Sequence, residues 1–350
     1  MVMVPRLVPS PPPTQVASSP AFAELCAQSC FSFLRGASQP EEIIEQAHKL
    51  GLYAIALCDT DGLYGLARAH AAAKQLQVKL IVGASLAVDS HDARLILLVR
   101  NHAGYQNLCR LLTIAHADKP KGTSSLDLAL LSPHADGLFA VLPAPHEEKL
   151  CDKVLSAFPA EHVRLAVQRH MGADQAKHEQ LAVSLAAQFR LRIFATARPL
   201  FHVAGRKQLA DVLCCIREKT SLDEAGTSLL PNAEAHLSSA TRMSRLFADH
   251  LEWVQESVDV AAQCTFSLSE LRYRFPSDHF LREGESPDQA LRRLVQERLP
   301  WRYPNGPEPS VRAQIDKELG LIEQLRVAPY FLSVYEIVEI ARERRILCQG

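Results

Sequence analysis

Seven short apolar runs, separated by stretches long enough for a helix, constrain the fold of this chain more than any other feature. The runs cover residues 22–26, 53–58, 80–88, 95–99, 138–142, 163–167 and 193–195. Runs without polar alternation are typical of strands buried on both faces, and helices between strands favour parallel pairing. The pattern predicts an α/β fold, either a barrel or a wound sheet, from residue 22 to about residue 196.

The first stretch between strands carries helix signals at both ends. Residues 38–41 (Ser-Gln-Pro-Glu) predict a capping box with proline in the first turn, and Gly51 predicts a left-handed end. Between them, one apolar stripe is formed by Ile43, Ile44, Ala47 and Leu50. We therefore expect a helix here that packs on the strands.

After residue 196 the strand signals become rare and helical patterns follow one another. Helices are predicted at about 205–218, 239–249, 251–263, 286–299, 308–326 and 330–345. The last two carry the apolar stripes Val311/Ile315/Leu319/Ile322 and Phe331/Val334/Val338/Ala341, which predict one buried face on each. The apolar residues 346–348 then resemble an opening strand, so we expect a longer protein that is truncated at Gly350.

Composition limits the class of protein. Six prolines in residues 1–20 predict a disordered leader. No apolar run reaches the roughly 18–20 residues of a membrane span, which predicts no membrane partner. The nine cysteines include no Cys-x-x-Cys, which fits a reducing cytoplasm better than a disulfide framework or zinc ribbon. A net charge of −1 excludes a strong overall basic field, so any contact with DNA must be local or supplied by a partner.

Few residues point to chemistry without further information. Asp59 and Asp61 follow the second apolar run and could hold a divalent cation, although an Asx-turn closed by Gly62 is the favoured interpretation. Cys26 and Cys30 lie near no cation that would predict a reactive thiolate. Candidate phosphate contacts at the end of the last predicted helix are Arg342, Arg344 and Arg345, for which a solvated helix end is the favoured alternative.

Seven strings, in order along the chain, resemble the polymerase-and-histidinol-phosphatase (PHP) region of bacterial C-family DNA polymerases. They cover residues 22–38, 101–113 (NHAGYQNLCRLLT), 211–217 (DVLCCIR), 231–237 (PNAEAHL), 266–273, 328–335 (APYFLSVY) and 346–350. The resemblance is strongest to the error-prone paralogue of the polymerase III alpha subunit, and it covers almost all of residues 22–350.

The resemblance implies a PHP-type distorted (β/α) barrel at residues 21–275, followed by a mainly helical segment, 276–350, that leads into a truncated polymerase palm. For the intact protein it implies Mg²⁺-dependent joining of deoxynucleotides on DNA, and contacts with other mutagenesis or replisome proteins. The catalytic aspartates of the family lie beyond Gly350. We therefore expect no catalytic residue and no cofactor in this segment.

The same resemblance locates the metal ligands of the PHP domain. The aligned positions hold Cys26, Gln28, Arg35, Thr60, Ser85, Arg94, Arg198 and Leu200. None is a histidine or carboxylate, and the three arginines would repel a divalent cation, so the resemblance implies a degenerate metal site and a structural barrel. Asp59 remains as one carboxylate. Two alternatives stay open, namely a stand-alone PHP-like metal-dependent phosphoesterase and a non-catalytic interaction module.

Overall fold

The computed structural model describes residues 20–89, 91, 94–272, 275 and 278–348. The chain forms two compact units, Met1–Glu270 and Leu271–Gly350. The leader predicted at residues 1–20 lies, except for Pro20, outside the described residues. The opening strand predicted at 346–348 is not found, because these three residues belong to no strand or helix.

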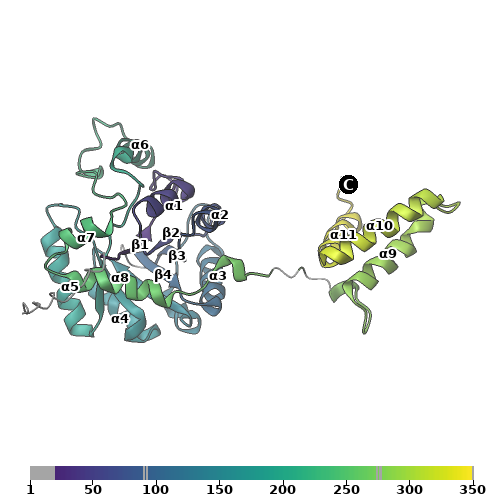
Figure 1. The fold of residues 1–350 in the computed structure, drawn as a ribbon, viewed down its shortest axis with the longest axis horizontal. Coiled ribbons are helices and arrows are strands. Elements are labelled where there is room, and N and C mark those ends of the chain that lie inside the picture. Colours follow the sequence, from purple (N-terminus) through teal and green to yellow (C-terminus); the bar gives the residue numbers. More distant parts are fainter. Residues whose placement is uncertain (1–19, 90, 92–93, 273–274, 276–277, 349–350) are drawn as a thin grey trace, which may run out of the picture. The chain divides into compact units, whose positions relative to one another are not determined.

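All seven apolar runs form strands, and the strands lie side by side in one sheet in the order of the sequence (Figure 1). They are β1 (Ala23–Ala27), β2 (Ala54–Thr60), β3 (Leu80–Ala87), β4 (Arg94–Val99), β5 (Leu138–Pro143), β6 (Val163–Val167) and β7 (Arg192–Ala195). Their inward side chains share one buried core. Most strand residues are buried, which explains why apolar runs without polar alternation identified the strands.

The parallel pairing expected for the whole sheet is wrong at β4. This strand runs antiparallel to both β3 and β5, whereas the pairs β1–β2, β2–β3, β5–β6 and β6–β7 are parallel. The connection from β3 to β4 is too short for a crossover helix, which parallel neighbours require. The reversal brings Arg94, the first residue of β4, opposite Ala87 at the end of β3.

Eight helices of the described residues accompany the sheet (Figure 1). They are α1 (Pro40–Lys49), α2 (Leu66–Leu76), α3 (His102–His116), α4 (Glu148–Ala157), α5 (Gln175–Phe189), α6 (Lys207–Glu218), α7 (Ala240–Leu246) and α8 (Leu251–Gln263). Helix α8 packs against both edge strands, β1 and β7. It contributes Val260 and Ala261 to the core of the sheet, so it covers the gap that the strands leave open.

The start of α1 differs by one residue from the prediction. Gln39, not Ser38, is the N-cap, and the carboxylate of Glu42 accepts a hydrogen bond from the Gln39 N–H at 2.8 Å. The Ser38 hydroxyl instead accepts the N–H of His202 at 2.9 Å, a long-range contact that the local pattern does not reveal. Gly51 has a φ of +62°, which confirms the predicted left-handed end.

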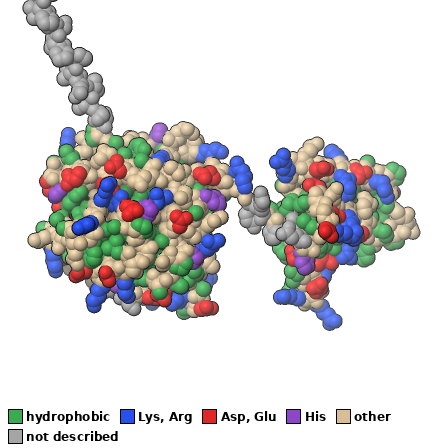
Figure 2. Space-filling view, turned by 90° about the horizontal axis from the view of Figure 1, so that it is seen from below, with side chains coloured by type: hydrophobic (Ala, Val, Ile, Leu, Met, Phe, Trp, Pro, Cys, Tyr) green, Lys and Arg blue, Asp and Glu red, His purple; other side chains and the backbone are tan. Residues whose placement is uncertain are grey.

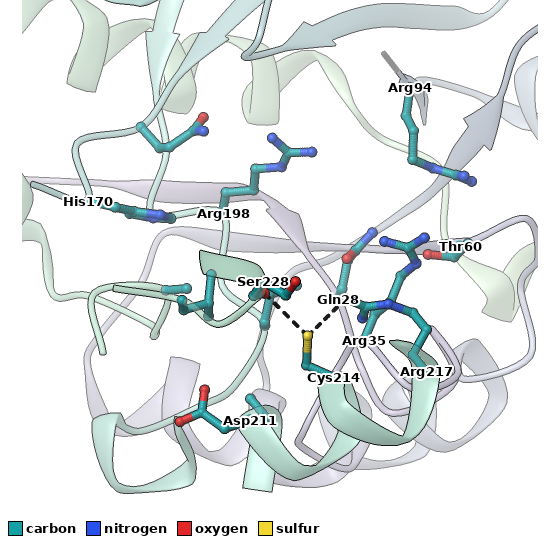
Figure 3. Close-up of a pocket in the computed structure, with 15 residues that line it drawn as sticks. Gln28, Arg35, Thr60, Arg94, His170, Arg198, Asp211, Cys214, Arg217 and Ser228 are labelled. Atoms are coloured by element: carbon teal, nitrogen blue, oxygen red, sulfur yellow. Dashed lines mark hydrogen bonds between the residues drawn. The ribbon is translucent and has the colours of Figure 1, made fainter. Parts of the chain in front are cut away.

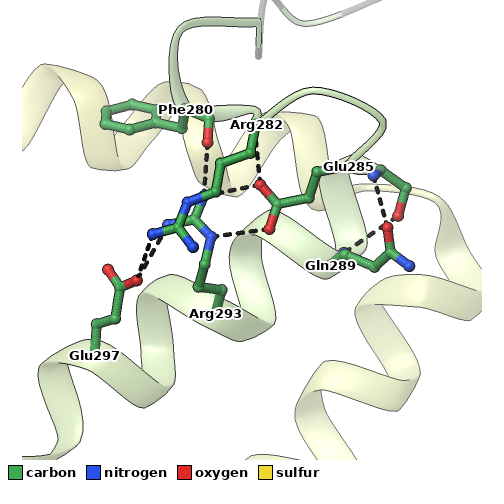
Figure 4. A network of polar contacts seen from close by, with 7 residues as sticks. Phe280, Arg282, Glu285, Gln289, Arg293 and Glu297 are labelled. Carbon is green, nitrogen blue, oxygen red and sulfur yellow. Dashed lines mark hydrogen bonds and ion pairs between the residues drawn. The ribbon is translucent and has the colours of Figure 1, made fainter.

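The second unit contains α9 (Pro287–Arg302), α10 (Pro309–Leu325) and α11 (Ala328–Glu343). Its small core includes Leu291, Leu319 and Leu332. Arg293 of α9 donates hydrogen bonds to the segment before this helix, to Glu285 at 2.8 and 2.9 Å and to the Phe280 carbonyl at 2.8 Å (Figure 4). The network holds the entry to α9 against the helix itself.

Three of the four residues of the apolar stripe predicted for α10 are confirmed, since Leu319 is buried and Ile315 and Ile322 pack against the same core, whereas Val311 is not part of it. The stripe predicted for α11 is wrong. Leu332 is its buried residue, together with Ala328, while Phe331 and Val334 are exposed. Apolar residues occur all around α11, so spacing alone did not identify the face that packs.

Candidate functional site

A cavity of about 290 Å³ lies at the carboxyl ends of β1, β2 and β7 (Figure 3). Six of the eight aligned PHP positions line it, namely Gln28, Arg35, Thr60, Arg94, Arg198 and Leu200. Strand ends are where α/β folds place their ligands. The other two positions do not line the cavity. Cys26 is buried in the sheet core, and the Ser85 hydroxyl accepts a hydrogen bond from Arg94 Nε at 3.0 Å.

Backbone hydrogen bonds join the segments that follow β1 and β7. The Gln28 N–H donates to the Pro199 carbonyl at 3.0 Å, and the Ala37 N–H donates to the Leu200 carbonyl at 2.7 Å. These bonds hold the loop that carries Arg35 beside the segment that carries Arg198. Residues far apart in the sequence thus meet at one edge of the sheet.

Two arginines of the cavity are held firmly. Arg94 donates to Asp61 Oδ1 and to the Ser85 carbonyl, each at 2.5 Å. Arg198 has a φ of +43°, a left-handed conformation that is costly for an arginine. Its N–H donates to Thr196 Oγ1 at 2.8 Å and its guanidinium donates to the Ala144 carbonyl at 2.5 Å. Strained residues of this kind cluster at functional sites, which makes Arg198 a candidate binding residue.

Two further arginines approach the cavity from the loop after β1 and from α6. Arg217, in the last turn of α6, donates to the Leu34 carbonyl and pairs with Glu218, both at 2.8 Å. Arg35 is exposed, and Figure 3 shows its side chain beside that of Arg217. The two side chains bring positive charge to the same part of the cavity wall.

The charges in the cavity repel one another. Partial desolvation at the cavity wall, followed by the charges of Arg217 and Arg94, lowers the pKa of Arg35, although the residue as a whole is exposed. Burial also lowers the pKa of Arg198, with further lowering by Arg94 and Arg35. Arg35 and Arg198 nevertheless stay protonated near neutral pH. Asp211 is the one carboxylate among the described lining residues, and it pairs with Lys207 at 2.6 Å.

Asp59 is not available as a metal ligand. The residue is 2% exposed, and its carboxylate accepts hydrogen bonds from the Ser29 N–H (2.7 Å), the Ser29 hydroxyl (2.8 Å) and the Ser32 hydroxyl (2.8 Å). The expected Asx-turn is therefore wrong for this residue. Asp59 pairs with a distant segment, and it organises the loop between β1 and α1.

The expected turn is also wrong at Asp61. Its Oδ1 atom accepts the N–H of Ala87 at 3.0 Å, besides the guanidinium of Arg94. The positive φ, +54°, belongs to Asp61 itself and not to Gly62. The carboxylate thus joins the ends of β2, β3 and β4.

A divalent cation does not fit this cavity. The ligands that Zn²⁺, Mn²⁺ and Mg²⁺ prefer are histidines, thiolates and carboxylates, whereas the walls carry four guanidinium groups. The walls also carry His170, Asp211 and Cys214, but each has another partner: the Ala197 carbonyl at 2.7 Å, Lys207 at 2.6 Å and the Ser228 carbonyl at 3.3 Å, respectively. Among the described residues, these three form no cluster with the spacing of a metal site. The nearby thiol of Cys26 is no substitute, because burial raises its pKa and keeps it protonated.

Another cluster has the spacing of a metal site. It lies in the first unit, Met1–Glu270, which we call the barrel unit. One ligand atom from each of Glu179, Asp249 and His250 lies within 4.8 Å of the others. Arg169 already occupies this cluster, since it donates to Glu179 at 2.9 Å and to Asp249 at 2.7 Å. Its hydrogen bonds lower the pKa of Asp249 to about 2. The two carboxylates thus already share one guanidinium as their partner.

Sequence reasoning missed the part of the wall that α6 and the residues after it provide. This part includes Asp211, Cys214, Arg217 and Ser228. Residues 211–217 of α6 belong to one of the strings that carry the family resemblance, but nothing in the sequence connects this helix with the strand ends. Arg217 could not be recognised as a partner of Arg35 without the tertiary structure.

Comparison with known proteins identifies both parts of the chain. Residues 24–190 match the PHP domain, and residues 289–350 match the bacterial DNA polymerase III alpha NTPase domain. The chain is 37% identical to the error-prone DNA polymerase of Ruegeria pomeroyi over 94% of its own length and 33% of that relative. It is 40% identical to the error-prone DNA polymerase of Dechloromonas aromatica, over 95% of this chain and 33% of the relative.

The chain is thus similar to error-prone DNA polymerases over almost its whole length. It spans about a third of the length of these relatives. The match of residues 24–190 to the PHP domain agrees with the resemblance in the sequence, while the bounds predicted for that domain, 21–275, stay a prediction. The helical unit contains the region that matches the polymerase alpha subunit.

The arginines at the end of α11 remain a prediction for phosphate contact. Arg342 donates to Glu339 at 3.0 Å, while Arg344 and Arg345 are exposed. On the barrel face that Figure 2 shows, positive and negative side chains are interspersed, in keeping with the net charge. Among the described residues, no helix is both long and apolar enough to cross a membrane.

Proposed function

We propose that this chain is the N-terminal region of an error-prone, translesion DNA polymerase whose PHP barrel holds no metal and supports the polymerase core structurally. The observation that carries the proposal is the set of guanidinium groups of Arg35, Arg94, Arg198 and Arg217 in the cavity at the strand ends. These side chains take the place in which a metal-dependent phosphoesterase would need ligands for its cations.

For the whole protein we propose DNA-templated joining of deoxynucleotides in the cytoplasm, with Mg²⁺ as the cofactor and with other mutagenesis or replisome proteins as partners. The likeness to error-prone DNA polymerases over almost the entire chain supports this. We propose that the present segment does not polymerise by itself. A stand-alone phosphoesterase is the less favoured alternative, because its reaction would need the missing ligands.

A hydrolysis assay tests the proposed loss of PHP chemistry. The purified chain, supplied with Mn²⁺, Zn²⁺ or Mg²⁺, is expected to hydrolyse neither a phosphate monoester nor the 3′ end of a DNA primer. The Thr60→Ala variant is the control that separates activity of the cavity from a contaminating phosphatase. Thr60 lines the cavity, and its hydroxyl has no hydrogen-bond partner among the described residues. Metal-dependent hydrolysis that falls in this variant would contradict the proposal, because a contaminating phosphatase would act equally in both preparations.

A further inference from the structure

The cavity at the strand ends contains more positive charge than its surroundings neutralise. Arg94 pairs with Asp61, and Arg217 pairs with Glu218. Arg35 and Arg198 form no ion pair with any described residue. Asp211 is the one carboxylate among the described lining residues, and it pairs with Lys207, so within the described part of the chain two positive charges are left without a counterion.

The donors around the cavity come from separate parts of the fold. Arg35 follows β1, Arg94 begins β4 and Arg198 follows β7, while Arg217 ends α6. Thr60, at the end of β2, adds a hydroxyl that lacks a hydrogen-bond partner among the described residues. Figure 3 shows Arg35 and Arg217 near Gln28 and Thr60, so donors of several kinds face the same space.

We propose that this cavity binds a small phosphate anion directly through its guanidinium groups, without a metal ion. The ligand class includes inorganic phosphate, oligophosphates and the phosphate tail of a nucleotide, which share the same chemistry. Guanidinium groups donate paired hydrogen bonds to phosphate oxygens, and a phosphate group carries a charge of about −1.5 to −2 near pH 7. That charge matches the two arginines without a carboxylate partner.

The size of the cavity agrees with a small ligand. Its volume of about 290 Å³ is just below the range for small-molecule sites, which starts at roughly 300 Å³. Holding like charges together costs free energy unless an anion compensates them. The proposal does not depend on the polymerase assignment, because it rests only on the charges and donors of this chain.

Calorimetric titration of the full chain with inorganic tripolyphosphate at low ionic strength tests the proposal. We expect saturable binding that is about tenfold weaker in Arg35→Gln, the effect of losing one charged hydrogen bond. Because Arg35 is exposed, the variant should fold, and without ligand it should melt at or above the wild-type temperature since a repelling charge is gone. Thr60→Val, which keeps every charge, should also weaken binding.

Arg190→Gln is the matched control. Arg190 is exposed and lies at the start of the connection into β7, whereas the cavity lies beyond the other end of that strand. The control removes the same charge from the barrel unit and should bind tripolyphosphate as the wild type does. Absence of binding to the wild type, or equal weakening by Arg35→Gln and Arg190→Gln, would overturn the proposal, because both results would exclude a localised site.

A parallel titration with dATP distinguishes the sources of the phosphate. Equal affinity for dATP and tripolyphosphate would support a site for the phosphate groups alone. Tighter binding of dATP, lost in Arg35→Gln, would support a site for a nucleotide. Binding of dATP that is unchanged in both Arg35→Gln and Thr60→Val would count against the cavity as the phosphate site.

Discussion

Replacing Arg164 by methionine should lower the free energy of unfolding of the barrel unit by about 3–5 kcal/mol. Arg164 lies in β6, and its Nε atom donates to Glu256 of α8 at 2.6 Å. Both side chains are buried, at 3% and 8% exposure. The variant leaves the Glu256 carboxylate in the core, and among the described residues only the exposed Arg192, 3.2 Å away, remains as an ion-pair partner. A buried charge that has lost its main partner is costly.

Urea unfolding, followed by the fluorescence of Trp253, measures this effect. Trp253 belongs to α8, and a Trp301→Phe background removes the other tryptophan of the chain. The double variant Arg164→Met/Glu256→Leu should regain most of the loss because it removes both buried charges. Arg192→Met, which removes the exposed partner, should cost less than about 1 kcal/mol. A loss in Arg192→Met as large as that in Arg164→Met would refute this account of the pair.

The second large effect is expected at Glu24, a fully buried residue of β1. Its carboxylate accepts hydrogen bonds from the Cys26 N–H at 2.9 Å, the Thr196 hydroxyl at 2.5 Å and the Ala197 N–H at 2.8 Å. These bonds connect β1 with the residues after β7, two edge strands that do not pair directly. Glu24→Gln would place an amide N–H₂ against one of these donors, and one unpaired buried donor costs about 1–3 kcal/mol.

Glu24→Ala should cost more than Glu24→Gln, because it leaves all three donors without an acceptor and creates a cavity. The same unfolding measurement applies, with Glu45→Gln as the control, since Glu45 is an exposed residue of α1. The control should change the stability by less than about 0.5 kcal/mol. If Glu24→Ala were as stable as the control, the carboxylate would not be what joins the two edges of the sheet.

The sequence predicted the strands well because nearly every strand residue is buried, and burial on both faces appears directly as an apolar run. It did not show which residues compensate the two charged side chains inside those runs. Glu24 and Arg164 are compatible with buried strands only because of Thr196, Ala197 and Glu256, which are remote in the sequence. Such partners are a property of the tertiary structure.

The candidate site was predictable in part. The aligned positions located Arg35, Arg94 and Arg198, and the structure gathers these three around one cavity. Arg94 reaches the cavity because β4 runs antiparallel to β3. The short connection between these strands requires the reversal, but the order of helices and strands alone did not predict it. Arg217 was not predicted, because its role depends on where α6 packs.

The metal content of the purified chain tests the central claim most directly. The protein is equilibrated with Zn²⁺ and Mn²⁺, dialysed, and measured by mass spectrometry. A His250→Ala variant is measured in parallel, so that any ion held by the surface cluster of Glu179, Asp249 and His250 is identified. We predict that neither protein retains a stoichiometric metal ion. Retention of about one ion or more per chain in the His250→Ala variant would contradict the claim that the cavity of four arginines has replaced a metal site.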